Sequence, residues 1–197
     1  FLAVNFDYDK RNQKFQTSSG FKSYYSLDLP IISEKNTLKN FYNYSHYFDL
    51  FDQNISTFSL MLRAANSITN DNIKLSERIN IPSRKLRGFE AGRVGPKDGE
   101  DFIGGNYAAA MNFSSTMPQL FEESQNIDFL FFIDAANLWG VDYDNNLDDD
   151  GTIRSSTGIA LDWFTPVGPL NFSLSLPLTK KNSDKTETFR FQLGTTF

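Results

Sequence analysis

The chain ends in Phe189-Arg190-Phe191-Gln192-Leu193-Gly194-Thr195-Thr196-Phe197. In a β-strand successive side chains point to opposite faces, so the mostly apolar odd-numbered residues share one face and the polar even-numbered residues share the other. This pattern is typical of a strand with lipid on one side and a water-filled lumen on the other. The ring of a terminal Phe197 can lie at the bilayer interface. The stretch therefore predicts the closing strand of a transmembrane β-barrel.

The composition agrees with this prediction. The chain has 197 residues, enough for one domain, and 20 of them are Phe. A soluble protein needs a large core to bury so many rings, whereas lipid accepts them on the outside of a barrel. The net charge of −5 argues against nucleic acid or an anionic membrane surface as a partner. Cysteine is absent, so disulfides and thiol chemistry are excluded.

The same alternation recurs along the chain and predicts about ten strands, each near the ~9–11 residues that cross a bilayer at a tilt. The segments are 1–9, 21–29, 38–49, 55–63, a short one at 73–81, 103–115, 127–139, 153–163, 170–178 and 189–197. Small residues on the inner face of 103–115 leave lumen space for another part of the chain. The longest apolar run, 129–133, is far shorter than the ~18 residues of a membrane helix.

The predicted connections differ in length. Residues 165–169 contain Pro, Gly and Pro and predict a tight turn, whereas 140–152 and 179–186 are longer and polar. Short turns at one rim and long loops at the other are typical of an outer-membrane barrel. A soluble β-sandwich or barrel remains the alternative, and residues 129–132, apolar on both faces, favour it slightly.

The longest irregular stretch, about 82–102, contains Leu86-Arg87-Gly88-Phe89. Loops of this length are often functional, and one on a barrel rim can fold back into the lumen. A buried Arg87 would then need a carboxylate partner, and the inward-facing Asp134 is the candidate. The alternative is that Arg87 is a solvated loop residue and Asp134 faces lumen water. The residues alone leave both interpretations open.

Other candidate sites are weaker. His46, the only histidine, lies among aromatic residues and is interpreted as a lumen or interface residue rather than a catalytic base. The acidic run 142–151 begins like a calcium loop, but Leu147 occupies the position of the required Gly and Ile153 that of the final Glu. We therefore expect a solvated loop, no catalytic residue, no metal and no cofactor.

Four segments together resemble the BamA family of outer-membrane assembly factors, which also contains TamA, the two-partner secretion transporters and organellar relatives. The segments are Leu86-Arg87-Gly88-Phe89, the strand motif 132–139, the stretch 153–170 and the terminal strand 189–197. They occur in the family's order and spacing. One departure is Ala136, where many members have Gly.

The resemblance implies an all-β fold: the C-terminal portion of an antiparallel transmembrane β-barrel, about ten strands of sixteen. Residues 1–197 would be the C-terminal part of the barrel domain, with the first strands and the periplasmic domains preceding them. The loop at about 82–102 would fold into the lumen. Arg87 would pair with Asp134, Phe89 would pack beside it, and Gly88 would permit the turn. Phe132 and Ala135 belong to the strand motif.

The resemblance also implies a function, the assembly and insertion of β-barrel proteins in the bacterial outer membrane. The partners would be unfolded outer-membrane protein clients, outer-membrane lipid and accessory lipoproteins, with no nucleic acid and no enzymatic step. The last strand would form a lateral seam and an assembly signal through Phe189, Phe191, Leu193, Gly194 and Phe197. The alternatives are a TamA-like protein or secretion transporter, and a small independent outer-membrane barrel acting as a pore or surface protein.

Overall fold

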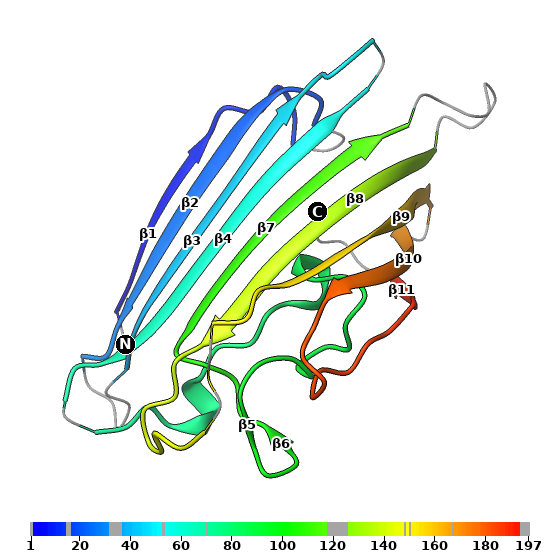
Figure 1. The fold of residues 1–197 in the computed structure, drawn as a ribbon. Helices are drawn as coiled ribbons and strands as arrows, with labels where there is room; N and C mark the ends of the chain where they lie inside the picture. Colours follow the sequence, from blue (N-terminus) through cyan, green and yellow to red (C-terminus); the bar gives the residue numbers. More distant parts are fainter. Residues whose placement is uncertain are drawn as a thin grey trace.

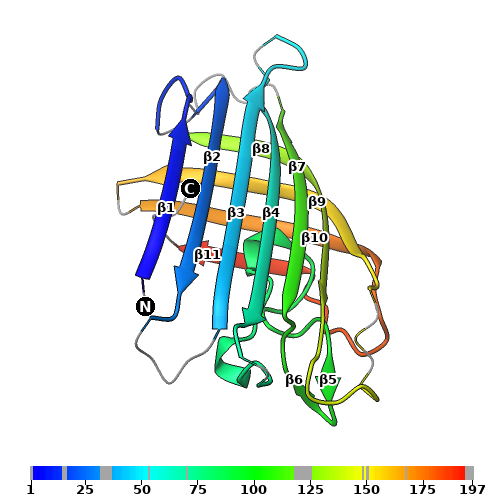
Figure 2. The same ribbon diagram turned by 90° about the vertical axis from the view of Figure 1, so that its left-hand side faces the viewer.

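Nine strands form one antiparallel sheet in the order β1-β2-β3-β4-β7-β8-β9-β10-β11, and the sheet curves into an open trough (Figures 1 and 2). The computed structural model describes residues 2–14, 17–31, 37–52, 54–69, 71–117, 126–147, 149, 151–166 and 168–193. The strands are β1 (Leu2–Asp9), β2 (Gly20–Leu29), β3 (Thr37–Phe48), β4 (Ser56–Ser67), β7 (Tyr107–Thr116), β8 (Ile127–Trp139), β9 (Arg154–Thr165), β10 (Gly168–Thr179) and β11 (Phe189–Leu193). None of the described helices combines the length and the apolar character needed to cross a membrane.

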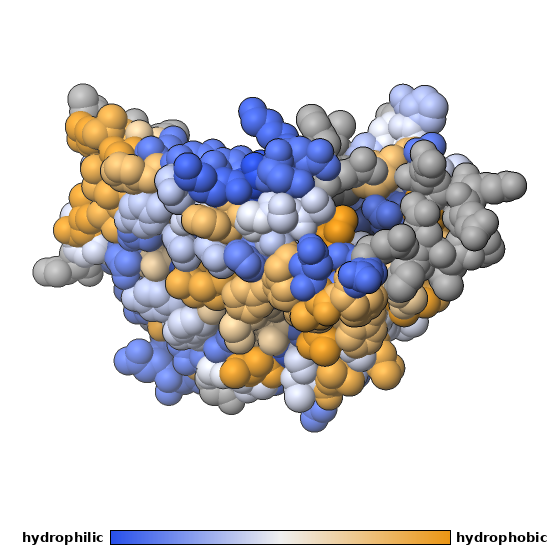
Figure 3. All heavy atoms as spheres, turned by 90° about the horizontal axis from the view of Figure 1, so that it is seen from above, coloured by the Kyte–Doolittle hydropathy of each residue, from blue (hydrophilic) through white to orange (hydrophobic). Residues whose placement is uncertain are grey.

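The alternation in the sequence becomes an inside and an outside. In β8 the side chains of Phe131 and Ile133 are exposed, whereas those of Phe132 and Asp134, which alternate with them, are fully buried. Exposed apolar side chains recur on β10 and β11, and hydrophobic residues gather on the lower side of the end-on view in Figure 3. The convex face therefore has the apolar character that lipid requires.

The long loops and the shortest turn lie at opposite ends of the strands. The two longest, 68–106 and 140–153, leave the sheet at the same end, and the two-residue connection from β9 to β10 lies at the other end. Among the described residues, β1 and β11 each pair on one side only and do not pair with each other. Over the described residues the sheet is therefore open, with β1 and β11 as its two edges.

The prediction of a short strand at 73–81 is wrong. This segment holds a 3₁₀ helix, η1 (Leu75–Glu77), and only Ile79 makes a β-bridge, to Gly105. Its isoleucines occupy odd-numbered positions, as in a strand, but they are buried under the loop and do not belong to a strand of the sheet. The connection between β4 and β7 therefore spans 68–106 and is longer than the predicted 82–102.

This connection, hereafter the lumen loop, lies against the concave face of the sheet (Figures 1 and 2). It contains η1, a second 3₁₀ helix η2 (Ser83–Lys85) and a hairpin of β5 (Lys97–Asp98) and β6 (Asp101–Phe102). Its buried apolar residues pack with small residues of the wall; the cluster is Met61, Ala65, Ile73, Ile79, Ile81, Leu86, Phe89, Val94, Ala108, Ala110, Ala136 and Leu138. The small inner residues of β7 thus provide the predicted space.

Overpacking this interface should loosen the lumen loop. Ala110 is buried on the inner face of β7, so Ala110→Leu should weaken loop packing by about 1–3 kcal/mol. Limited proteolysis of the protein in detergent should then cleave the loop faster. Ala109→Leu, the same substitution on the outer face of the same strand, is the control. Equal cleavage of both variants would contradict the packing described here.

Candidate functional site

The tip of the lumen loop is held by a bidentate ion pair. Arg87 Nε donates to Asp134 Oδ2 at 2.8 Å, and Arg87 Nη2 donates to Asp134 Oδ1 at 2.7 Å. The Asp134 side chain is wholly buried and that of Arg87 is 14% exposed. The guanidinium fork fits a carboxylate in this arrangement. The sequence left two interpretations open, a pair or two solvated residues. The structure has the pair, with Arg87 and Asp134 in contact.

Asp134 has further donors. The backbone N–H of Arg87 donates to Oδ2 at 3.0 Å, and Asn112 Nδ2 donates to Oδ1 at 2.8 Å. Asn112 Nδ2 also donates to the carbonyl of Lys85 at 2.9 Å. A buried carboxylate is tolerated when its lone pairs are filled in this way, and removing one partner leaves an uncompensated charge.

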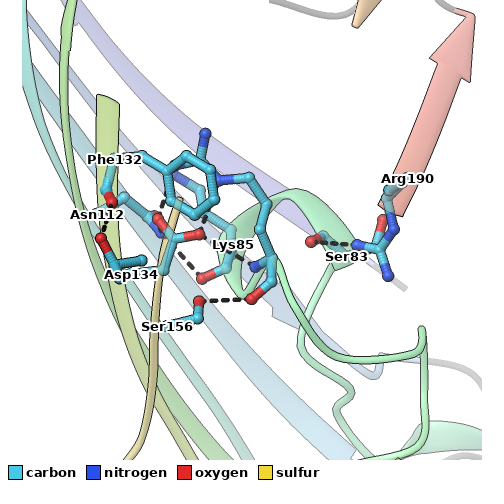
Figure 4. Close-up of polar contacts among 9 residues, drawn as sticks. Ser83, Lys85, Asn112, Phe132, Asp134, Ser156 and Arg190 are labelled. Atoms are coloured by element: carbon cyan, nitrogen blue, oxygen red, sulfur yellow. Dashed lines mark hydrogen bonds and ion pairs between the residues drawn. The ribbon is translucent and has the colours of Figure 1, made fainter. Parts of the chain in front are cut away.

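The strand register explains why these groups converge. Asn112 on β7 lies opposite Asp134 on β8, which lies opposite Ser156 on β9, so the three form one inward-facing row. Ser156 Oγ donates to the carbonyl of Arg87, and Figure 4 shows the row pointing toward the loop. Asp134 and Ser156 therefore bind Arg87 from β8 and β9, and Asn112 on β7 binds Lys85 two residues earlier in the loop.

An aromatic ring completes the environment of the guanidinium. Arg87 Cζ lies 3.6 Å from the ring centroid of Phe132, which is fully buried. Such a desolvated cation–π contact adds ~2 kcal/mol of attraction. Gly158 on β9 leaves room for the ring, because a Cβ there would lie 2.7 Å from Phe132 Cζ. Ala135, the other predicted motif residue, alternates to the outer face beside Met111 and Ser155.

The remaining motif residues are buried around the turn. Gly88 has φ +87°, and a Cβ there would lie 3.2 Å from the Cβ atoms of Ser156 and Ser175. Only glycine fits this conformation and this space comfortably, in agreement with the role expected for Gly88. Leu86 and Phe89 are buried, and Phe89 forms a β-bridge with Thr186.

The closing strand also holds the loop, through a residue that the sequence reasoning missed. Arg190 of β11 donates through Nη1 to the carbonyl of Ser83 at 2.7 Å (Figure 4). It also donates through Nη2 to the carbonyl of Phe89. Gln192 donates to Ser83 Oγ at 3.0 Å. The alternation of the terminal strand indicated that Arg190 points inward. It did not indicate which loop residues Arg190 would contact.

On its other face β11 carries the predicted apolar side chains. Phe189, Phe191 and Leu193 are all more than half exposed, as expected for a lipid-facing strand. Gly194 and Phe197, which were predicted to belong to the same seam, lie outside the described residues.

Two further ion pairs brace the long connections. Arg154 and Asp184 form a buried bidentate pair at 3.0 and 3.1 Å, which fastens the β10–β11 connection to β9. That connection runs along the loop tip, where Glu187 N donates to Gly88 O at 3.0 Å. Arg78 of the lumen loop pairs with Asp142 at 2.5 Å. The acidic run is therefore not wholly a solvated loop, because Asp142 holds the lumen loop.

Taken together, these features define a class: a membrane β-barrel wall with an apolar exterior and a loop fastened inside its lumen. The model of the Omp85 superfamily domain matches residues 1–197, and the chain belongs to that superfamily. It is an integral β-barrel protein of the bacterial outer membrane.

Individual relatives agree with this assignment. The chain is 31% identical over 139 residues to outer membrane protein assembly factor BamA of Neisseria meningitidis serogroup B, covering 57% of this chain and 17% of that protein. It is 28% identical over 156 residues to BamA of Neorickettsia risticii, covering 77% and 21%. The crystal structure of BamA from Haemophilus ducreyi lacking POTRA domains 1–3 superposes with a TM-score of 0.85 at 28% identity, covering 96% of this chain and 41% of that one. The chain thus spans about a fifth of the length of these curated relatives.

The ion pair gives a direct test of loop attachment. Arg87→Ala leaves Asp134 buried without its main partner and should weaken the attachment by about 3–5 kcal/mol. Limited proteolysis should cleave the lumen loop, while the strand content measured by circular dichroism stays unchanged. Arg93→Ala, at an exposed arginine of the same loop, is the control. Unchanged protease protection in Arg87→Ala would exclude the pairing as the anchor.

Proposed function

We propose that the chain serves the assembly and insertion of β-barrel proteins in the outer membrane. The observation that carries the proposal is the likeness to the BamA barrel over 96% of the chain, at a TM-score of 0.85. The names of the bacterial relatives, outer membrane protein assembly factors, point the same way. The partners would be unfolded outer-membrane protein clients, outer-membrane lipid and accessory lipoproteins.

The mechanism we propose is strand addition at a lateral seam. β11 pairs with β10 along one side, and an unpaired strand edge is a template for another strand. A client strand would add there through backbone hydrogen bonds. Phe189 and Phe191 would keep the seam in contact with lipid, into which the client's apolar face would move. Pairing and burial of client strands would supply the free energy, so no nucleotide, cofactor or catalytic residue is needed.

The lumen loop would act as a conformational brace for this seam. Through Arg87 it binds β8 and β9, and through Ser83 and Phe89 it accepts hydrogen bonds from Arg190 on β11. One short segment therefore connects the interior wall to the last strand. Releasing it should change the position of β11 and hence the geometry that it offers to a client.

Client assembly tests the proposal. In proteoliposomes, Arg87→Ala should lower the yield of folded client barrel several-fold, whereas Arg93→Ala should not. The double variant Arg87→Asp/Asp134→Arg restores opposite charges and should recover part of the yield. If Arg87→Ala assembles clients normally although its loop is protease-sensitive, the brace is not part of the mechanism. If the unaltered protein supports export of a secreted substrate but no client assembly, the transporter alternative replaces the proposal.

A further inference from the structure

A polar cavity of about 520 Å³ lies between the tip of the lumen loop and the inner faces of β2, β3, β4 and β7. Every side chain that lines it is polar or charged. The lining residues are Arg11, Lys22, Tyr24, Asn43, Ser45, Tyr47, Ser59, Arg84, Lys85, Arg87, Asn112 and Ser114. Cations are prominent among them and carboxylates are absent from this set. None of the lining residues belongs to β11.

Part of the cationic charge is balanced from outside the cavity lining. Arg11 pairs with Asp9 at 2.7 Å, and Lys22 pairs with Asp7 at 3.1 Å. Arg87 pairs with Asp134, as described above. Lys85 differs, because its ammonium group has no ion pair within the part of the chain that the structure describes.

The surroundings of Lys85 are strongly cationic. Burial, followed by the nearby Arg84, lowers the pKa of Lys85 to about 8, and Arg87 and Arg63 act in the same direction. Only Asp134 opposes them, and its oxygens already accept hydrogen bonds from Arg87 and Asn112. At neutral pH the lysine therefore carries its charge where little compensates it, a state that a bound anion would relieve.

The strands that line the cavity restrict the kind of ligand. β2, β3, β4 and β7 are each paired on both sides, so they offer no free backbone edge to an extended peptide. What remains is a set of guanidinium, ammonium, hydroxyl and amide donors. This chemistry suits the several acceptor oxygens of a compact, multiply charged oxyanion.

We propose that this cavity binds a phosphate group, either free or carried on a lipid headgroup, with Lys85 and Lys22 as the main contacts. The volume exceeds what one phosphate ion needs and leaves room for the group that carries it. The site does not depend on the assembly role proposed above.

Calorimetric titration of the native polypeptide in detergent with inorganic phosphate and pyrophosphate at constant ionic strength tests the site. Lys22→Gln/Lys85→Gln should bind at least tenfold more weakly, whereas Lys97→Gln, on the β5–β6 hairpin outside the cavity, should bind normally. Phosphate should bind with proton uptake near pH 8, and its affinity should fall from pH 7 to pH 9, because Lys85 loses its charge as the pH rises through its pKa of about 8. Unchanged loop proteolysis in the double variant would show that the fold is intact.

A second arm separates the two sources of phosphate. Nanodiscs that contain phosphatidic acid should displace pyrophosphate if the site takes a lipid headgroup, and should not if it takes a soluble ion; both results support a phosphate site. Equal affinity in the double variant and the unaltered protein would overturn the proposal. Binding of an acidic peptide without binding of either phosphate probe would overturn it as well.

Discussion

The buried pair of Arg87 and Asp134 is the constraint on which the concave side of this nine-stranded sheet depends. A carboxylate with no solvent exposure is stable only if donors surround it, and here four donor groups from two residues fill its oxygens. The pair therefore fixes where the loop tip lies and which way Asn112 points. Because the donors come from the loop and from β7, loop and wall cannot separate without breaking the ion pair and the hydrogen bonds that hold this carboxylate.

The rest of the interior follows from that attachment. Once the tip is placed, Phe132 covers the guanidinium and Gly158 provides the room for its ring. Farther along the loop, isoleucine, leucine and valine side chains fill the space above the small residues of β7 and β8. Arg190 then connects the tip to the terminal strand. The interior is thus polar where the loop is fastened and apolar where it packs.

The wall was predictable from the sequence because period-two alternation depends only on neighbouring residues. In β8, Ile133 and Asp134 were assigned to opposite faces, and the structure agrees. Asp134 was a candidate partner of Arg87 because the long loop and the inward carboxylate were both visible, but the residues alone left the pairing open and only the family resemblance implied it. The prediction of a strand at 73–81 failed because alternating isoleucines have the same sequence pattern whether they lie in a sheet or pack under a loop.

Contacts that depend on register could not be predicted. The hydrogen bonds of Arg190 to Ser83 and Phe89 join residues about a hundred positions apart, and no local pattern specifies them. The row of Asn112, Asp134 and Ser156 likewise exists only because two strand registers place them side by side. The basic cavity could not be predicted either, because its cations come from β2, the loop tip and the β1–β2 connection, which only the folded arrangement brings together.

The central claim is that the loop tip is held against the wall by the buried ion pair, and a distance measurement in the membrane tests it directly. The chain has no cysteine, so spin labels can be attached to cysteines introduced at two exposed positions, Ala91 in the lumen loop and Ile153 just before β9. Pulsed electron paramagnetic resonance should give one narrow distance distribution, which broadens and shifts when Asp134→Asn is added. A broad distribution without that substitution, or an unchanged narrow one with it, would contradict the account.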